Sequence, residues 1–597
     1  MLYQNNISDK SIVEMLVTIE HTIDEIAYLS YEGIELWPII RLILWQKLVH
    51  SNYEVPKKNS FKNLKFPLYT LSQSQNAELN KYRICDILFF SKWNEHAVQK
   101  DNAFFNVHID PIIAYLKDYK YFKIELATNQ SKQTFPRFIN TYLLNPEMRV
   151  NTVNIENGIN NFIDIQKQIQ DITGITVDEY EIIKSIYDTI AWELFFSNIL
   201  SIIHPKALFL VFFGYNTGMG LIRACKKKDI IIVDIQHGVQ GDYHPYYTRW
   251  TTITHKSKIC SILPDYCWCW GESTKRNMDQ WMNPKDIPII KTVVGGYPRL
   301  SLWKNKEDFI INDRMRNFYK FIEQKQKVIL VSLSHEQLPI PEHVFSAMSM
   351  VRNKNWIWLF RLHPNHRSQS MVKQIELLSK KYQVNNLEIE CATFFPLFGL
   401  LKRSHHHVSL CSSVFYEAFA FEVETTMIHP ISITLFENDY KKSLFRYADT
   451  AESLIDSIQM EKRNHLDYTF FVQTDKNITM DSIDTILSRK IVSQYNSELH
   501  YVRALNELGV NVLNNGHKRA AIKILLKAYD MNTMSAIVAN NIGIIYTQLG
   551  EAINAAHFFV AALEKAQNNN MIIKNVTILL KLLTGEVDSN EALQILL

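Results

Sequence analysis

The sequence predicts an α/β protein with two Rossmann-like domains facing a cleft, followed by a C-terminal all-α repeat region. Three observations support this fold class. Short apolar runs alternate with longer amphipathic stretches, which is the pattern of βαβ units around a mainly parallel sheet. The runs form two series along the chain. After about residue 490 the composition changes to helix formers that carry an internal repeat.

A chain of 597 residues is too long for one hydrophobic core, and four segments are expected. Residues 1–80 are interpreted as an N-terminal helical accessory segment, with periodic apolar residues at 12–29. The first Rossmann-like domain is expected at 81–320 and the second at 321–490. Helical repeats fill 491–597.

Strands of the first domain are predicted at the apolar runs 84–90, 123–127, 207–213 and 230–235. The region 240–325, which contains the segments 267–270 and 292–297, should complete this domain and cross to the second. Gly214–Gly220 joins one run to a helix that ends near residue 228, as in a strand–turn–helix entry. Strands of the second domain are predicted at 327–333, 356–362, 408–410 and 426–429. A cleft between two such domains is a common place for a ligand.

Six residues of the C-terminal region recur 34 positions later: Asn506, Leu508, Gly509, Gly516, Ala521 and Ala528 as Asn540, Ile542, Gly543, Gly550, Ala555 and Ala562. A period of this length resembles the tetratricopeptide repeat, and the stretch 572–597 would supply capping helices. Such repeats are expected to dock a partner protein or to mediate self-association. The alternative is that they only close the second domain.

The composition is that of a folded protein, with 47% apolar and 21% charged residues. A formal net charge of +3 over this length gives no electrostatic case for nucleic-acid binding. Seven cysteines without regular spacing argue for a reducing compartment and against a disulfide framework. Cys267 and Cys269 alternate on an expected strand and are interpreted as packing residues.

Membrane insertion is not expected. The first residues lack the pattern of a signal peptide, and no run is long and apolar enough to cross a bilayer, which predicts a cytoplasmic protein. A basic and aromatic cluster is compatible with a peripheral membrane contact, although such a pattern more often belongs to a solvated linker. The cluster consists of Lys57, Lys58, Phe61, Lys62, Lys65 and Phe66.

Two histidine motifs stand where strands are expected to end, namely Asp234-Ile235-Gln236-His237-Gly238 and Arg361-Leu362-His363-Pro364. In open α/β sheets, ligands bind beyond the carboxyl ends of the strands. Pro364 forces His363 out of helical geometry, and the imidazole could donate to a phosphate oxygen while Arg361 or Arg367 neutralises charge. The alternative is a histidine that only caps a strand end.

Ser412 and Ser413 follow another expected strand and precede an expected helix. Serines at a helix start cap it, and the free N–H groups there attract anions. His363, Ser412 and Ser413 together make a candidate phosphate clamp, with helix capping alone as the alternative. The run His405-His406-His407 is not interpreted as a metal site, because consecutive strand residues point to opposite faces.

Glu156 precedes a glycine turn at Asn157-Gly158. The order of this acidic residue, the His-Pro motif and the serine pair resembles the motif series of bacterial sialyltransferases and polysialyltransferases. In those families the acidic residue is the base, and the His-Pro and serine motifs hold the CMP of the donor. This chain departs from the series at Asn157, where an acidic residue is usual.

With the Asp234 motif added, residues 84–440 most resemble the retaining β-Kdo transferases of O-antigen and capsule assembly, which have a GT-B fold and use CMP-Kdo. The resemblance implies that Asp234 is the nucleophile and Glu156 the acid/base group, both on the acceptor side in the first domain. It implies further that the second domain binds the nucleotide. The residues expected to hold the donor are Arg361, His363, Pro364, Ser412, Ser413, Gln236, His237 and Arg249.

The expected reaction moves a 2-keto sugar acid from CMP to a bacterial surface glycan, at the inner face of the inner membrane if the protein is peripheral. A carboxylate can capture the oxocarbenium-like state, and a second one can deprotonate the acceptor hydroxyl. Neither a metal nor another cofactor is expected. The alternatives are an inverting sialyltransferase-like enzyme, a CDP-glycerol-type transferase and a non-catalytic repeat-bearing scaffold.

Overall fold

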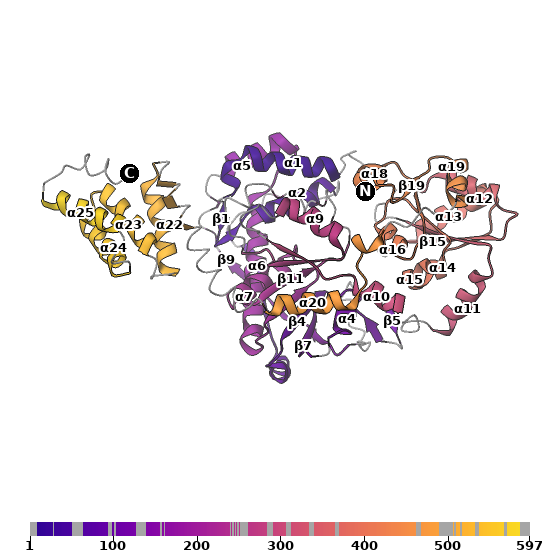
Figure 1. The fold of residues 1–597 in the computed structure, drawn as a ribbon, viewed down its shortest axis with the longest axis horizontal. Helices are drawn as coiled ribbons and strands as arrows, with labels where there is room; N and C mark the ends of the chain where they lie inside the picture. The colour runs from indigo at the N-terminus through magenta and orange to yellow at the C-terminus, as the bar shows by residue number, and fades with distance from the viewer. Residues whose placement is uncertain are drawn as a thin grey trace. The chain divides into compact units, whose positions relative to one another are not determined.

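The computed structural model divides by its internal contacts into two compact units, Met1–Leu487 and Ser488–Leu597 (Figure 1). The residues that it describes are 9–27, 29–49, 64–92, 98–100, 103–116, 118–126, 139–153, 155, 158–159, 162–238, 240, 244, 246–247, 250, 261–282, 290–305, 312–333, 339–363, 369–460, 467–488, 505–506, 509–510, 512–513, 516–531, 536–565 and 570–584.

The first sheet contains seven strands in the described part of the chain, and the first of them lies inside the sheet. In chain order they are β4 (Ile87–Lys92), β7 (Tyr121–Leu126), β8 (Tyr142–Leu144), β10 (Ala207–Leu210), β11 (Ile231–Ile235), β12 (Tyr266–Cys269) and β13 (Lys291–Val294). Their spatial order is β13-β12-β11-β10-β4-β7-β8, and every neighbouring pair is parallel. This is the Rossmann order with one strand added at an edge.

The second sheet repeats the same winding with six strands among the described residues. They are β14 (Lys327–Ser332), β15 (Trp356–Arg361), β16 (Leu387–Glu388), β17 (His406–Ser409), β18 (Thr425–Met427) and β19 (Arg446–Tyr447). All pairs are parallel, in the order β16-β15-β14-β17-β18-β19. The two Rossmann-ordered sheets confirm the predicted α/β fold class with a GT-B-like layout.

Alternate residues of the first sheet pack on opposite faces, so both faces are covered. Leu88 and Ile232 belong to the core on one face, whereas Phe89 and Val233 belong to the core on the other. The helices of the first face include α1 (Asp9–Thr22), α2 (Trp37–Val49), α5 (Phe162–Thr173), α6 (Glu179–Ile202) and α7 (Asn216–Lys226). The other face packs against α4 (Asp110–Ile113) and α20 (Lys476–Ser488).

The N-terminal helices are part of this first core. A buried ion pair joins Arg41 of α2 to Glu20 of α1 at 2.6 Å, and the indole N–H of Trp37 donates to the same carboxylate oxygen at 2.7 Å. The strands β3 (Leu64–Thr70) and β9 (Glu147–Val153) form an antiparallel ribbon, and Tyr69 of β3 stacks on Trp192 of α6. Of the basic cluster, only Lys65 and Phe66 lie within the described residues, on β3.

The second sheet is also covered on both faces. Ile329 and Trp358 pack with α12 (Glu342–Met350), α13 (Gln369–Lys381) and α19 (Ala451–Gln459). Leu330 and Leu359 pack on the other face with α10 (Pro298–Asn305), α11 (Asp313–Glu323), α15 (Leu397–Leu401) and α16 (Val414–Ala420).

The chain returns to the first sheet at α20, which lies beside α4 (Figure 1). Ile483 and Ile486 of this helix belong to the core under the first sheet. The hydroxyls of Thr479 and Ser482 donate to the carbonyls of Gly295 and Val294 at 2.8 and 2.9 Å. The sequence ranges proposed for the four segments stay predictions, because the internal contacts separate only residues 1–487 from residues 488–597.

The C-terminal unit contains α22 (Lys518–Met531), α23 (Ala536–Gln548), α24 (Ala552–Lys565) and α25 (Asn570–Thr584). Its geometry repeats every 34 residues. Asn541 donates to Asn506 at 2.8 Å, and Asn575 donates to Asn540 at 2.9 Å. Gly516 and Gly550 both have a positive φ, of 86° and 77°. The unit is therefore a helical repeat, while its assignment to the tetratricopeptide class stays a prediction.

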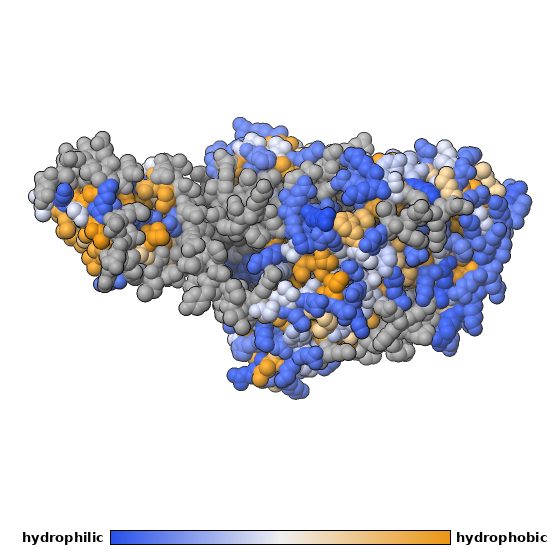
Figure 2. Space-filling model, in the orientation of Figure 1, coloured by the Kyte–Doolittle hydropathy of each residue, from blue (hydrophilic) through white to orange (hydrophobic). Residues whose placement is uncertain are grey.

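Large apolar side chains remain exposed on this helical unit, as the orange atoms of Figure 2 show. They are Ile537, Ile553, Val560, Ile573, Leu580 and Leu583. In the part of the chain that the structure describes, no helix combines the length and apolar character needed to span a membrane.

Candidate functional site

Residues that follow the carboxyl ends of both sheets meet in one place, which we call the crevice. The hydroxyl of Tyr297, just past β13, donates to Glu417 of α16 at 3.3 Å. A pocket in the crevice is lined from the first domain by Gln236 and Trp270, and from the other side by Tyr416 and Phe471. The crevice therefore lies where ligands of open α/β sheets bind.

Asp234 lies at the end of β11 and is 1% exposed. Its Oδ1 accepts the backbone N–H of Phe213 at 3.1 Å, and its Oδ2 accepts the hydroxyl of Tyr247 at 2.7 Å. Burial raises the pKa of the Asp234 carboxyl to about 7, and the two hydrogen bonds partly oppose this rise. The carboxyl is thus held in a fixed orientation and titrates near neutral pH.

Gln236 connects the end of β11 to the next strand and helix. Its Oε1 accepts the backbone N–H of Trp270 at 2.6 Å, and its Nε2 donates to Gly238 at 2.9 Å and to Thr274 at 3.3 Å. Its backbone carbonyl accepts the indole N–H of Trp270 at 3.0 Å. Trp270 in turn stacks on Tyr297, with ring centres 4.0 Å apart and planes within 7°. These contacts give the crevice a rigid floor.

His237 is enclosed by rings. Its centroid lies 5.2 Å from that of Phe212, 6.2 Å from that of Tyr247 and 6.3 Å from that of His108. Burial lowers the pKa of His237 to about 4, so the imidazole is neutral at physiological pH. Its Nδ1 is buried and has no hydrogen-bond partner among the described residues. Phe212 holds a left-handed backbone, with φ of 52°, a strain that is often found at functional sites.

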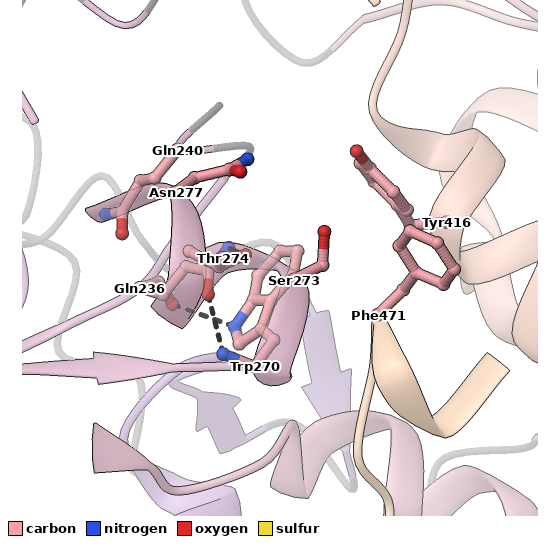
Figure 3. A pocket seen from close by; sticks show the side chains of 8 residues that line it. All are labelled: Gln236, Gln240, Trp270, Ser273, Thr274, Asn277, Tyr416 and Phe471. Atoms are coloured by element: carbon pink, nitrogen blue, oxygen red, sulfur yellow. Dashed lines mark hydrogen bonds between the residues drawn. The ribbon is translucent and has the colours of Figure 1, made fainter. Parts of the chain in front are cut away.

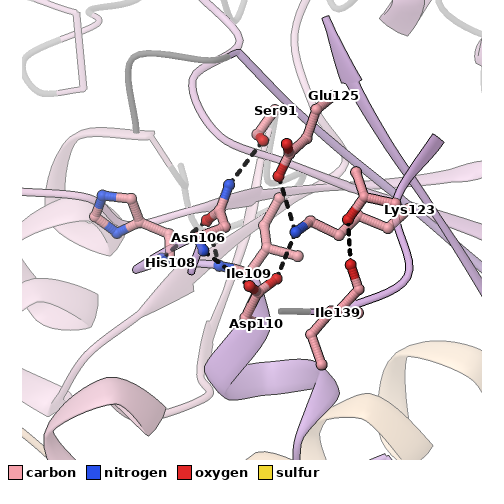
Figure 4. A network of polar contacts seen from close by, with 9 residues as sticks. Ser91, Asn106, His108, Ile109, Asp110, Lys123, Glu125 and Ile139 are labelled. Atoms are coloured by element: carbon pink, nitrogen blue, oxygen red, sulfur yellow. Dashed lines mark hydrogen bonds and ion pairs between the residues drawn. The ribbon is translucent and has the colours of Figure 1, made fainter. Parts of the chain in front are cut away.

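His108 enters the crevice on a turn that buried polar groups hold (Figure 4). Oδ1 of Asn106 accepts the backbone N–H groups of His108 and Ile109 at 3.1 and 2.9 Å, and Nδ2 of Asn106 donates to Ser91 at 2.8 Å. The backbone N–H of Asn106 donates to Asp110 at 2.8 Å. The turn is therefore fixed from within.

The charge of Asp110 is balanced by a buried ion pair (Figure 4). Nζ of Lys123 lies 2.6 Å from Asp110 and 2.8 Å from Glu125, and all three side chains are 0% exposed. Burial raises the pKa of the Asp110 carboxyl, and Lys123 opposes this rise. The triad thus connects β7 to the turn that carries His108.

Arg299 and Glu417 bring opposite charges to the crevice from the two sheets. Burial raises the pKa of Glu417 to about 7, and the Arg299 cation, the Tyr297 hydrogen bond and Arg361 oppose this rise. Oε2 of Glu417 is buried and has no hydrogen-bond partner among the described residues. Burial, His237 and Arg299 hold the pKa of His108 well below its usual range.

The second motif lies at the end of β15. The guanidinium of Arg361 donates through Nη1 to the carbonyls of Ala392 and Phe395 at 2.6 and 2.7 Å. His363 is half-buried two residues beyond the strand, and Pro364 lies outside the described residues. Arg361 therefore contributes to the electrostatics of the crevice while part of its guanidinium holds the backbone.

The serine pair lies between β17 and α16, as expected. The helix cap differs from the expectation. Ser413 occupies the N-cap position with a helical φ of −59° and ψ of −12°, and its side chain makes no capping bond. In the extended conformation typical of an N-cap, the hydroxyl would reach the first turn. Ser412 accepts the N–H of Val414 in a long contact of 3.4 Å.

The predicted site residues fall into three groups. Asp234, Gln236 and His237 adjoin one another at the end of β11. In the second domain, Arg361 is the last residue of β15, His363 follows that strand, and Ser412 and Ser413 follow β17. Glu156, Arg249 and Pro364 lie outside the described residues, so their predicted roles stay predictions.

Sequence reasoning missed three charged or titratable residues of the crevice, His108, Arg299 and Glu417. Arg299 comes two residues after the segment 292–297, and the rule that singled out His363 could have found it if that segment had been interpreted as a strand. Glu417 lies four residues after Ser413, in the helix expected to follow the serine pair. His108 comes three residues after the short apolar run Ala103-Phe104-Phe105, which was not interpreted as a strand.

The three consecutive histidines have separate partners, as the alternation of a strand requires. Nδ1 of His405 accepts the backbone N–H of Val328 at 3.0 Å. Nε2 of His406 lies 2.8 Å from the hydroxyl of Thr426, and Nε2 of His407 lies 2.7 Å from that of Ser332. Among the described residues, no three or more His, Cys, Asp or Glu side chains are grouped to hold a metal.

No protein-family model matches the chain, and no curated protein is similar to it in sequence. Solved structures that it resembles include the UDP-GlcNAc 2-epimerase from Neisseria meningitidis bound to UDP-GlcNAc, with 12% identity over 68% of this chain and 100% of that chain and a TM-score of 0.43. The enzyme of the same name from Methanocaldococcus jannaschii shows 14% identity over 67% of this chain and 99% of that chain, with a TM-score of 0.43.

The trehalose-6-phosphate phosphatase N-terminal domain of Candida albicans shows 10% identity over 68% of this chain and 99% of that chain, with a TM-score of 0.40. Likenesses at this level carry no inference about activity or substrate. The fold class of this chain rests on its own strand order.

Proposed function

We propose that this chain is a glycosyltransferase that moves a 2-keto sugar acid, Kdo, from a CMP-activated donor to a bacterial surface polysaccharide, either lipopolysaccharide O-antigen or capsule. The observation that carries the proposal is the meeting of polar residues from two Rossmann-ordered sheets, seen in the Tyr297–Glu417 hydrogen bond. Ligands of such sheets bind at this edge. The choice of donor rests on the resemblance of the Asp234, His363 and serine motifs.

The charges of the crevice fit a donor with two anionic groups. A CMP-linked sugar acid carries a phosphate and a carboxylate, and guanidinium groups bind both with paired hydrogen bonds. Arg299 lies just past β13 and Arg361 ends β15, and the positive charges of both lower the pKa of Glu417. They are the cations that we assign to the donor, together with His363 and the two serines.

The proposed reaction retains the configuration of the sugar. Asp234 attacks the anomeric carbon, the bond to the phosphate oxygen breaks, and CMP leaves. Glu156 then deprotonates the acceptor hydroxyl, which displaces Asp234 and releases the product. Asp234 is 1% exposed, so we expect the side chains above it to shift when the donor enters.

The test is the release of CMP by the full chain with CMP-Kdo, with CMP-sialic acid as an alternative donor. Release of CMP from CMP-Kdo is expected, and Asp234→Asn and Glu156→Gln should each abolish transfer. Asp313→Asn is the matched control, because the Asp313 side chain is 92% exposed on α11. Normal turnover in the Asp234 variant would contradict the nucleophile assignment.

Two further measurements separate the alternatives. His363→Ala should weaken CMP binding, and an unchanged CMP affinity would count against the phosphate clamp. CDP-glycerol tests the glycerol-type transferase through release of CMP. If the wild-type chain processes no donor at all, the non-catalytic scaffold is favoured and the proposal fails.

A further inference from the structure

Helix α2, near the N-terminus, contacts the residues on either side of Tyr247. Arg41 and Trp45 lie four residues apart on α2, and side chains at that spacing share one side of a helix. Cζ of Arg41 lies over the ring of Trp250, 4.5 Å from its centre. The ring centre of Trp45 lies 5.7 Å from that of His244. One side of α2 therefore packs against both neighbours of this tyrosine.

The residues that α2 contacts are tied to Tyr247 by hydrogen bonds to the backbone. The indole N–H of Trp250 donates to the carbonyl of Tyr246 at 3.0 Å, and the backbone N–H of Tyr247 donates to the carbonyl of His244 at 3.1 Å. The hydroxyl of Tyr247 in turn donates to Oδ2 of Asp234 at 2.7 Å. A displacement of Trp250 or His244 would therefore move this hydroxyl away from the carboxyl.

Asp234 lies on the face of the first sheet that the N-terminal helices cover. Alternate residues of β11 point to the same side, and Ile232 belongs to the same core as Ile40 and Leu44 of α2. Gln236, two residues beyond Asp234, borders the pocket in the crevice (Figure 3). The strand therefore runs from the core that α2 helps to form to the edge where the crevice opens.

Arg41 is itself held in place by a charge. Its Nη1 lies 2.6 Å from Oε1 of Glu20, and both side chains are 0% exposed. The indole N–H of Trp37 donates to the same oxygen at 2.7 Å. Apolar residues can often replace a buried ion pair without a loss of stability. The pair is therefore better explained by the fixed position that it gives the guanidinium above Trp250.

The titration of Asp234 reports whether the Tyr247 bond is made. Of the described residues, Tyr247 and, from the neighbouring strand β12, Cys267 interact electrostatically with Asp234. Burial raises the pKa of both well above their usual ranges, so both are uncharged at neutral pH. The hydrogen bond from Tyr247 lowers the pKa of Asp234, and its loss should raise that pKa.

We propose that Arg41 is a positioning residue for the transfer reaction, which acts with Glu20 to hold Trp250 and thereby keeps the Tyr247 hydroxyl on Asp234. The inference rests on the proposed function, because Asp234 is the nucleophile only in that reaction. The N-terminal helices, expected as an accessory segment, then contribute to the reactive site.

The experiment compares the double variant Glu20→Gln/Arg41→Met with the wild-type full-length chain. The double variant removes both charges together, so no unpaired charge stays in the core. Infrared difference spectroscopy follows the C=O band of protonated Asp234, identified by its loss in Asp234→Asn, as the pH is varied. The midpoint should rise by about one unit, as in Tyr247→Phe. At acidic pH, kcat/KM for CMP-Kdo should fall by up to about tenfold.

Lys47→Met/Glu181→Gln is the matched control. Lys47 lies on the same helix, and its ion pair with Glu181 at 2.7 Å joins α2 to α6, with side chains 5% and 11% exposed. This control should leave the midpoint of Asp234 in place. When Tyr247→Phe is added to the Arg41 double variant, no further shift is expected, because both changes remove the same hydrogen bond.

Thermal unfolding verifies the fold of each variant. If the double variant does not fold, Trp45→Leu removes the contact with His244 and should move the midpoint in the same direction. The inference is overturned if the midpoint stays in place or falls, if the control moves it as far, or if the shift adds to that of Tyr247→Phe. A raised midpoint in a chain that does not consume CMP-Kdo would support the positioning of Tyr247 and refute the proposed transfer. Transfer with an unmoved midpoint would do the reverse.

Discussion

At the scale of the residue, the titration of Asp234 makes the proposed chemistry testable. A nucleophile must be ionised, and the pKa of this carboxyl is about 7, so kcat/KM for CMP-Kdo should rise with pH through about 7. The hydrogen bond from Tyr247 lowers this pKa, and Tyr247→Phe removes it. The acidic limb of the pH–rate profile should then move upward by about one unit, the value of one hydrogen bond to a charged group.

Tyr119→Phe is the control for this shift, because the Tyr119 hydroxyl donates to Asp484 and not to the crevice. Its profile should match that of the wild-type chain. An acidic limb that stays in place in Tyr247→Phe, or that moves to lower pH, would mean that another group governs the rate.

The buried triad around Lys123 gives a stability prediction. Lys123→Met leaves Asp110 and Glu125 buried without their cation, which should cost about 3–5 kcal/mol in the free energy of unfolding. Urea unfolding at neutral pH measures this loss. Because protonation removes the unpaired charges, the loss should shrink as the pH falls.

Lys206→Met is the control, since the Lys206 side chain is 56% exposed in its pair with Asp86. It should change the free energy of unfolding by less than about 1 kcal/mol. Equal losses in the two variants would contradict the role given to the buried triad.

Single residues differ in how far the sequence predicts them. Asp234 and His363 stand at the ends of apolar runs, and the general rule for parallel sheets places them at a binding edge. His108 reaches the crevice only because Asn106 and the charged triad hold its turn. That arrangement combines segments that are far apart in the sequence, so local sequence patterns do not predict it.

At the scale of the element, the sequence predicts the positions of the long strands better than it predicts which elements pack against each other. The runs at 230–235 and 356–362 correspond to β11 and β15 within about one residue, because buried parallel strands are continuous apolar runs. The short strands β8, β16 and β19 have two or three residues each and leave no such run. The return of α20 to the first sheet was also not predicted, since amphipathic periodicity does not identify the surface that a helix covers.

Gly220 of α7 also has a packing role that the glycine pattern alone did not show. A Cβ on Gly220 would lie 2.5 Å from Cβ of Trp192 and 2.7 Å from the carbonyl oxygen of Thr189, both on α6. Gly220→Ala should therefore reduce the free energy of unfolding by about 1–3 kcal/mol, as overpacking does. The gain of about 1 kcal/mol in helix propensity is too small to offset a clash with backbone.

Leu194→Ala on α6 is the control for this contact, because Leu194 is 54% exposed. It should change the free energy of unfolding by less than about 0.5 kcal/mol, as surface substitutions usually do. A Gly220→Ala protein as stable as the wild-type chain in urea would show that α6 and α7 can separate without cost.

At the scale of the whole molecule, the two compact units predict that the chain can be shortened at one point and not at another. A chain that ends at Ser488 keeps α20 and every contact of the first unit, so its thermal unfolding and CMP release should match those of the full chain. A chain that ends at Asp475 lacks α20. It uncovers the core that contains Ile483 and Ile486, and Gly295 loses its hydrogen bond from Thr479.

Because Gly295 immediately precedes the segment that carries Tyr297 and Arg299, the shorter chain should lose CMP release as well as stability. Circular dichroism on heating and CMP release with CMP-Kdo measure the two effects side by side. If the chain that ends at Asp475 were as stable and as active as the chain that ends at Ser488, α20 would be an accessory helix rather than part of the first domain's core.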